Sequence, residues 1–145
     1  MNLILYHPLI VFAFFIAMMI GTANSHAADK HEHGMHADSQ MRKLHAMMPM
    51  FSVASGKMEL ALERNDRATV EAEANRILAA IPDLKKSRQH KNPGQHKKYV
   101  ELASQLESTV KVTVQHFRNG DTVRAKASFA AVTKACSACH ARFRD

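Results

Sequence analysis

Near its C-terminal end the sequence carries five residues whose types and spacing suit a metal-containing cofactor. They are Cys136-Ser137-Ala138-Cys139-His140, and the chain has 2 cysteines in all. The pattern C-x-x-C-H is the attachment signature of c-type haem. In that chemistry the two thiols add across the two vinyl groups of haem, and the adjacent imidazole binds the iron from one side. We therefore predict one haem c per chain, bound through Cys136 and Cys139, with His140 as an axial iron ligand.

Three other interpretations use the same residue types. A redox-active C-x-x-C pair is a reactive dithiol, but it is typical of a βαβ context. A structural zinc site generally needs four ligands, and no second ligand pair at knuckle spacing is present. A disulfide between the two cysteines would close a very small loop and stabilise the fold little. The haem hypothesis is favoured over these three.

Length and composition predict one small helical domain. The chain has 145 residues, of which 46% are hydrophobic, 23% charged and 6% aromatic, with no Trp. This is enough for one compact core, and the low aromatic content favours a helix bundle over a β-sandwich. The formal net charge of +7 favours an acidic partner, a membrane surface or nucleic acid, without selecting among them.

Residues 1–27 are predicted to be a signal peptide. They contain no Lys, Arg, Asp or Glu, and residues 8–20 are wholly apolar, a run too short for a typical membrane span. Small residues then permit cleavage after Ala27 or after Ser25, although no Lys or Arg precedes the apolar run. The alternative is an uncleaved anchor helix, the one case in which we expect attachment to a membrane. In both cases we expect the mature chain in the periplasm.

Apolar residues at helical spacing predict an all-α domain over residues 39–145, after a flexible His-rich arm at 28–38. Four amphipathic helices with mostly short loops favour an up-down-up-down four-helix bundle with its haem near the C-terminus. Strand-like alternation is confined to 110–114, where the helical pattern on both sides overrides it. The predicted inward-facing residues are Met41, Leu44, Met48, Phe51, Ser55, Met58, Leu62, Val70, Ala74, Ile77, Leu78, Ile81, Tyr99, Leu102, Leu106, Val110, Thr113, Phe117, Phe129, Val132, Cys136, Cys139 and Phe143.

Capping and helix-breaking residues mark the expected helix boundaries. The first helix runs over 39–64. The other boundary residues are Asn65 or Asp66 and Pro82 for the second helix, Pro93-Gly94 and Asn119-Gly120 for the third, and Asp121 or Thr122 for the fourth. Residues 82–94 are expected to form a basic loop.

The place of the motif on the last predicted helix points to a family. The string CSACHARFR, which ends in Phe143 and Arg144, resembles the C-terminal signature of cytochrome c′ and of cytochromes of the c-556 type. The resemblance covers roughly residues 39–145 and implies a periplasmic electron carrier, with homodimers common in the family. It also implies that the first helix supplies whatever lies on the far side of the haem. We find no paired carboxylates or nucleophile–base set beside the motif, so we do not expect an enzyme.

The resemblance assigns the sixth iron ligand of low-spin members to a Met near the start of the first helix. The matching residue is Met47, with Lys43 four positions before it where the family usually has Arg. Neighbouring residues leave this register open, namely Met48, Met50 and His45, and a Met stripe is also typical core filler. Met ligation suits an electron carrier. In cytochrome c′ itself an apolar residue stands there, and the alternative function is a five-coordinate binder of NO or CO.

Basic and His-rich segments suggest further partners. Six basic residues are expected to form a docking face for an acidic redox partner: Lys85, Lys86, Arg88, Lys91, Lys97 and Lys98. Nucleic acid is not expected outside the cytoplasm. Three basic residues near the motif are candidates to pair with the haem propionates, namely Lys134, Arg142 and Arg144. The N-terminal histidines are candidates to capture Cu(II), Ni(II) or Zn(II): His26, His31, His33 and His36.

Overall fold

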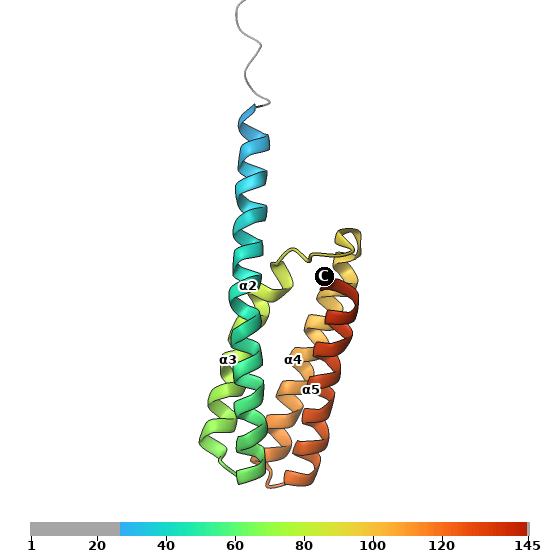
Figure 1. Cartoon of the computed structure of the whole chain (residues 1–145). Helices are drawn as coiled ribbons and strands as arrows, with labels where there is room; N and C mark the ends of the chain where they lie inside the picture. Colours follow the sequence, from blue (N-terminus) through green and yellow to red (C-terminus); the bar gives the residue numbers. More distant parts are fainter. Residues whose placement is uncertain (1–26, 145) are drawn as a thin grey trace, which may run out of the picture. The chain divides into compact units, whose positions relative to one another are not determined.

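Four α-helices make up most of the chain between residues 27 and 144, the part that this computed structural model describes (Figure 1). They are α2 (Ala27–Arg64), α3 (Arg67–Lys86), α4 (His96–Arg118) and α5 (Thr122–Phe143), and a short 3-10 helix, η1 (Pro93–Gln95), precedes α4. No strand occurs within this range, which confirms the predicted all-α class. In the same range no helix is long and apolar enough to cross a bilayer.

The chain divides into two units, residues 1–35 and 36–145, and the packing below is that of the second. Its core is one cluster of buried apolar side chains drawn from all four helices. The predicted stripe of α4 is wholly buried, whereas on α2 Met41, Met48 and Ser55 are only partly buried. The largest side chains with almost no exposed surface are Met58, Leu62, Val70, Ile77, Ile81, Val110 and Val132. Helical periodicity therefore identified the core correctly.

Contacts between neighbouring helices define the order of packing. Helix α4 packs against both α3 and α5. Helix α2 is linked to α3 by the ion pair Lys57–Glu73 at 3.7 Å and to α5 by Lys126–Glu63 at 2.6 Å. A third ion pair, Lys85–Glu107 at 2.7 Å, reinforces the contact between α3 and α4. Of these pairs only Lys126–Glu63 lies fully at the surface, where ion pairs stabilise a fold weakly, since Glu73 is buried and Lys85 and Glu107 are partly buried.

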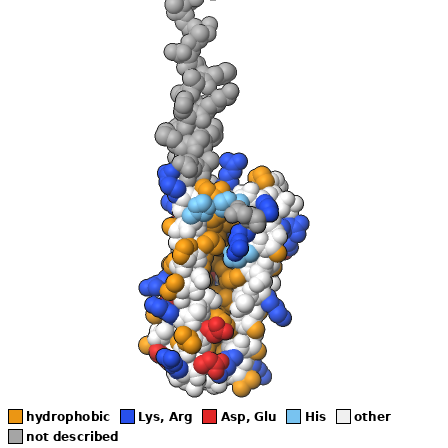
Figure 2. Space-filling view, viewed as in Figure 1, with side chains coloured by type: hydrophobic (Ala, Val, Ile, Leu, Met, Phe, Trp, Pro, Cys, Tyr) orange, Lys and Arg blue, Asp and Glu red, His pale blue; other side chains and the backbone are white. Residues whose placement is uncertain are grey.

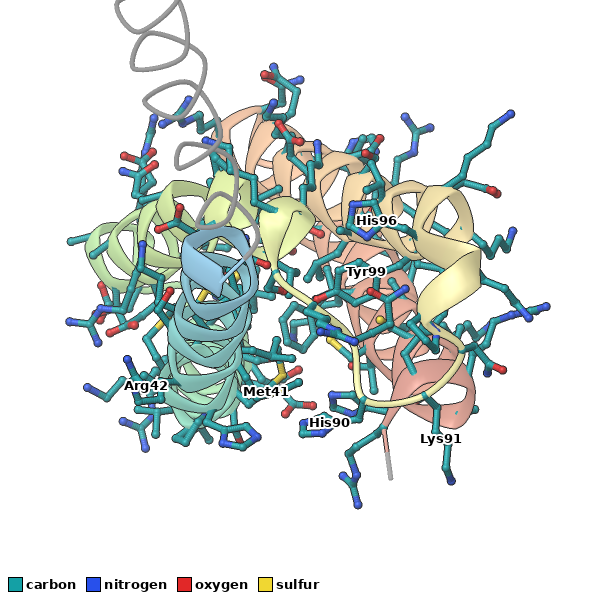
Figure 3. The ribbon with its side chains drawn as sticks, turned by 90° about the horizontal axis from the view of Figure 1, so that it is seen from above. Met41, Arg42, His90, Lys91, His96 and Tyr99 are labelled. Atoms are coloured by element: carbon teal, nitrogen blue, oxygen red, sulfur yellow. The ribbon has the colours of Figure 1, made fainter. Side chains whose placement is uncertain are left out.

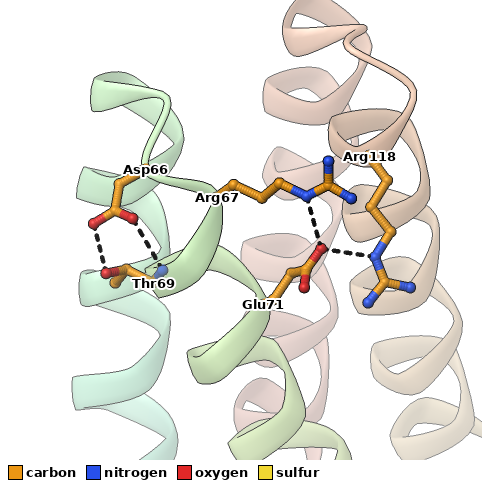
Figure 4. A network of polar contacts seen from close by, with 5 residues as sticks. All are labelled: Asp66, Arg67, Thr69, Glu71 and Arg118. Atoms are coloured by element: carbon orange, nitrogen blue, oxygen red, sulfur yellow. Dashed lines mark hydrogen bonds and ion pairs between the residues drawn. The ribbon is translucent and has the colours of Figure 1, made fainter.

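The turn from α2 to α3 is fixed by a cap, as the sequence predicts (Figure 4). The Asp66 carboxylate accepts hydrogen bonds from the Thr69 N–H at 3.1 Å and the Thr69 hydroxyl at 2.6 Å. These bonds hold the pKa of Asp66 below its usual value. Nearby, Glu71 accepts from Arg67 Nε at 3.1 Å and from Arg118 Nε at 2.9 Å. The start of α3 is thereby joined to the end of α4.

The other predicted caps are also present. Asn119 ends α4, Gly120 adopts the left-handed φ of +78° that favours glycine, and Asp121 caps α5 by accepting from the Arg124 N–H at 2.9 Å. The three residues together make a tight turn, which places the start of α5 directly beside the end of α4.

Two predicted boundaries are wrong. Pro82 does not stop α3, which continues to Lys86. A proline removes one backbone hydrogen bond, but Ile81 and Leu84 are both buried, and their burial favours continuing the helix. The backbone of residues 28–38 is helical, so α2 begins at Ala27 rather than at residue 39. These residues contain no proline that would interrupt a helix.

The predicted roles of the N-terminal residues, a signal peptide and a His-rich arm, are not tested by the bounds of α2. The predicted signal peptide, residues 1–27, lies outside the described residues apart from Ala27. The side chains of the predicted His-rich arm, residues 28–38, lie outside them as well.

A matched pair of leucines on α2 tests this core. Leu62 is 2% exposed and Leu60 is 56% exposed. We expect Leu62→Ala to lower the free energy of unfolding by about 2–5 kcal/mol, because it leaves a cavity among packed side chains. Leu60→Ala, on the solvent side, should change it by less than about 0.5 kcal/mol. Urea unfolding followed by circular dichroism measures both, and equal losses would show that the assigned core face is incorrect.

Candidate functional site

One end of the bundle core is not filled by side chains. A cavity of about 670 Å³ lies there, lined by residues of all four helices and of the segment that follows α3. Figure 2 shows the hollow on this face, with apolar side chains along it and histidines towards one end. Protein interiors are otherwise close-packed, and cavities of roughly 300–1,000 Å³ are typical of cofactor and ligand sites. The cavity therefore indicates a site for a large, mainly apolar ligand.

Small side chains keep this space open. The residues that face it include Ser52, Ser55 and Gly56 on α2, Ala103 on α4 and Ala135 on α5. A Cβ atom built on Gly56 would meet no atom within 4 Å, so the backbone there borders free space. The buried Met58 and Leu62 follow on α2, where the core is filled again. Side-chain size along α2 thus separates a packed part of the core from an open one.

The C-x-x-C-H motif lies on α5 and borders this cavity. Cys136, Cys139 and His140 all line it, because positions three and four residues apart share one face of a helix. Both cysteines are half-buried and neither forms a disulfide, whereas His140 is exposed. The motif residues that the sequence singles out are therefore brought together on one wall.

Burial shifts the protonation of the two thiols. It raises the pKa of Cys136, and it raises that of Cys139 to about 11, with the neighbouring Cys136 adding to the shift. Both groups are therefore neutral thiols at pH 7. A redox-active dithiol needs the opposite shift, since the thiolate is the reacting form. The two thiols therefore lack the activation that a redox-active pair requires.

Helix α2 forms the wall of the cavity that contains Leu44, His45 and Met48. Met47, the ligand that the resemblance implies, is partly buried against the core and does not line the cavity, nor does Met50. Successive residues of a helix point about 100° apart, so Met47 and Met48 face different directions. The role of Met47 as an iron ligand stays a prediction. Met48, rather than Met47, lines the α2 wall of the cavity.

The loop between α3 and α4 carries a second histidine to this wall. The backbone N–H of Lys91 donates to the Phe143 carbonyl at 3.2 Å, and the Asn92 side chain donates to the Arg142 carbonyl at 2.8 Å. These bonds satisfy carbonyls at the end of α5 that have no partner within the helix. They also hold His90, which Figure 3 shows next to Lys91, with its Nε2 atom 3.0 Å from His45 Nε2. Sequence reasoning missed this pairing.

Tyr99 of α4 forms a rigid part of the lining (Figure 3). The Ser87 hydroxyl donates to the Leu84 carbonyl at 2.7 Å, so the Tyr99 hydroxyl must donate to Ser87 Oγ, also at 2.7 Å. The Tyr99 ring meets Phe143 edge-on, with centroids 5.3 Å apart. The sequence placed Tyr99 in the core, but a buried tyrosine with a satisfied hydroxyl is also a well-fixed wall for a planar ligand.

The predicted cations near the motif separate in the structure. Arg144 lines the large cavity. Arg142 donates from Nε to the Gln95 side chain at 2.7 Å and lines a second cavity of about 480 Å³, together with Lys91 and Lys98. Lys134 lines neither cavity. Of the three residues, Arg144 is therefore best placed to pair with an acidic group of a ligand in the large cavity.

Thiol reactivity tests the environment of the motif. In the ligand-free folded protein we expect iodoacetamide at pH 7 to modify Cys139 about 100-fold more slowly than in the urea-unfolded chain, because a pKa of about 11 leaves little thiolate. The rate should rise with pH and reach half of its maximum near pH 11. Mass spectrometry of quenched samples gives the rates. A half-maximal rate at or below pH 7 would indicate an activated redox dithiol instead.

Comparisons with known proteins do not assign this chain to a family. Neither protein-family models, nor curated proteins, nor solved structures give a match to this chain. The resemblance to cytochrome c′ and c-556-type cytochromes thus rests on the motif and the predicted fold alone.

Proposed function

We propose that this chain is a periplasmic c-type cytochrome that carries electrons through one covalently bound haem. A single observation supports the proposal most strongly. Both thiols of C-x-x-C-H, the adjacent His140 and a methionine of the facing helix line the same apolar cavity. The proposed topology is the up-down-up-down bundle, in which the last helix carries the attachment motif.

The residues of the cavity fit this cofactor. Cys136 and Cys139 would hold haem through thioether bonds to its two vinyl groups, with the hydrogen of each thiol retained on the neighbouring carbon. His140 would bind the iron, and Arg144 is placed to neutralise a propionate. When bound, haem would supply an iron that exchanges one electron. The mainly apolar lining of the cavity suits the porphyrin ring.

The second axial ligand that we propose comes from α2. Met48 lines the cavity with the motif residues, so we assign it this role ahead of Met47. With Met48 and His140 as its two protein ligands, a bound haem iron would be six-coordinate, and the thioether would raise its reduction potential relative to harder ligands. No coordination position would then be open to an exogenous gas. These properties are those of an electron carrier rather than of a binder of NO or CO.

An acidic protein is the redox partner that we propose. Lys85 and Lys98 of the predicted basic face are engaged by Glu107 and Glu101, each at 2.7 Å. The remaining members of that face are exposed and form no ion pair among the described residues: Lys86, Arg88, Lys91 and Lys97. Uncompensated cations steer an acidic partner towards this end of the bundle. Export by a signal peptide and formation of a homodimer remain part of the proposal.

Adjacent methionines provide a matched test of the axial ligand. We expect Met48→Ala to convert the exported protein from a six-coordinate, low-spin form to a high-spin form that binds CO when reduced, because the thioether is lost. Met47→Ala, which removes the same side chain one residue earlier, should keep the low-spin spectrum. Optical spectra of the ferric and ferrous proteins, with and without CO, distinguish these states.

The other possible spectra have equally definite meanings. Loss of the low-spin form in Met47→Ala alone would return the ligand to the residue that the family resemblance implies. A wild-type protein that is already high-spin and binds CO would contradict an electron carrier of this kind and support the gas-binding alternative.

A further inference from the structure

Two histidines from distant parts of the sequence meet at the rim of the cavity. His45 of α2 and His90 of the loop before α4 have their Nε2 atoms 3.0 Å apart, with ring centroids 5.0 Å apart and ring planes inclined by only 13°. Both side chains are exposed, and both line the cavity. The proposed electron-carrier function gives this pair no role.

The distance between these nitrogens fits a shared cation as well as a shared proton. In the hydrogen bond one imidazole donates from Nε2 and the other accepts with the Nε2 lone pair. If the donor carries its proton on Nδ1 instead, both Nε2 lone pairs become available. Imidazole nitrogens bind zinc at about 2.0–2.1 Å. Two such bonds to one ion span a gap of this size with only small side-chain rotations.

The surrounding donors decide which ion fits. Among the described residues no group of three or more His, Cys, Asp or Glu side chains is arranged to hold a metal ion, which disfavours a four-ligand zinc site. Met41 lies four residues before His45, so both share one face of α2. Figure 3 shows Met41 on the side of α2 that faces His90. Thioether sulfur is a soft ligand that selects Cu(I).

We propose that His45, His90 and Met41 form a binding site for Cu(I) at the rim of the cavity. The ion replaces the proton shared by the two imidazoles, and the Met41 sulfur completes a low coordination number. The site joins α2 to the loop before α4 with a bond stronger than the present hydrogen bond. It does not depend on the haem, since none of its ligands belongs to the attachment motif or is Met48.

The test is a competition titration of the full exported protein, with its cofactor kept reduced and oxygen excluded. Cu(I) is supplied from a coloured chelator of known affinity, and its transfer to the protein is followed by absorbance. We expect His45→Ala and His90→Ala each to abolish one Cu(I)-binding equivalent or to weaken its affinity at least about 100-fold. Loss of a contact that only supports a metal ligand weakens affinity by about 10–100-fold, so an effect of this size indicates a direct ligand. The double variant should lose no more than either single variant.

Two further variants keep the result interpretable. Met41→Leu preserves side-chain volume and should weaken Cu(I) binding without changing the melting temperature. His116→Ala, in the last turn of α4, should leave every Cu(I) equivalent unchanged and controls for the loss of one histidine elsewhere in the bundle. The proposal is overturned if the His45 and His90 variants titrate like the wild type, if Met41→Leu has no effect, or if Zn(II) binds at this site as tightly as Cu(I).

Discussion

The half-buried thiols of Cys136 and Cys139 face a space that the protein itself does not fill, and this condition shapes one end of the bundle. A helix bundle is stabilised by closing its apolar stripes on one another. Here the stripes close around Met58, Leu62 and Val110, but beside the thiols they leave a cavity whose lining mixes large side chains with small ones such as Ala103 and Ala135. An interior left open in this way lacks the packing contacts that the rest of the core has. A ligand in the cavity would supply those contacts, so we expect its binding to raise the stability of the folded chain.

The elements around the cavity are held by contacts that do not depend on a ligand. The Asp66 and Asp121 caps fix the two turns at the opposite end of the helices. At the cavity end, hydrogen bonds from Lys91 and Asn92 attach the loop before α4 to the last residues of α5. The walls are therefore positioned by the backbone, while the space between them stays available. Such an arrangement would hold the proposed iron ligands in place as the iron changes charge, which the proposed electron-carrier function requires.

Much of the fold is readable in the sequence because it follows from local rules. Helical periodicity identified the buried face of every helix, and short polar side chains or glycine marked two of the turns correctly. Pro82 was misjudged because a local rule about backbone bonding competes with burial of Ile81 and Leu84, which only the packed structure shows. Met48 was predicted to face inward and was left open as an iron ligand, but the sequence did not decide between it and Met47, the residue that the family resemblance implies. One residue of register turns a side chain by about 100°, and this separates Met47 from Met48.

The contact between His45 and His90 could not be predicted from the sequence. The two residues are 45 positions apart, and His90 is brought to α2 by hydrogen bonds that its neighbours make to α5. No periodicity encodes such a contact. The C-x-x-C-H motif is the reverse case, since its spacing alone predicts covalent haem attachment, and the structure shows that its members line one wall of the cavity.

Intact-mass spectrometry of the exported protein, made in cells that mature c-type cytochromes, tests the central claim most directly. The account predicts a mature chain heavier than its amino acids by the mass of one haem, and a Cys136→Ala, Cys139→Ala double variant that has lost this addition. A wild-type protein whose mass equals that of the bare polypeptide would contradict covalent haem attachment, and with it the proposed electron-carrier function.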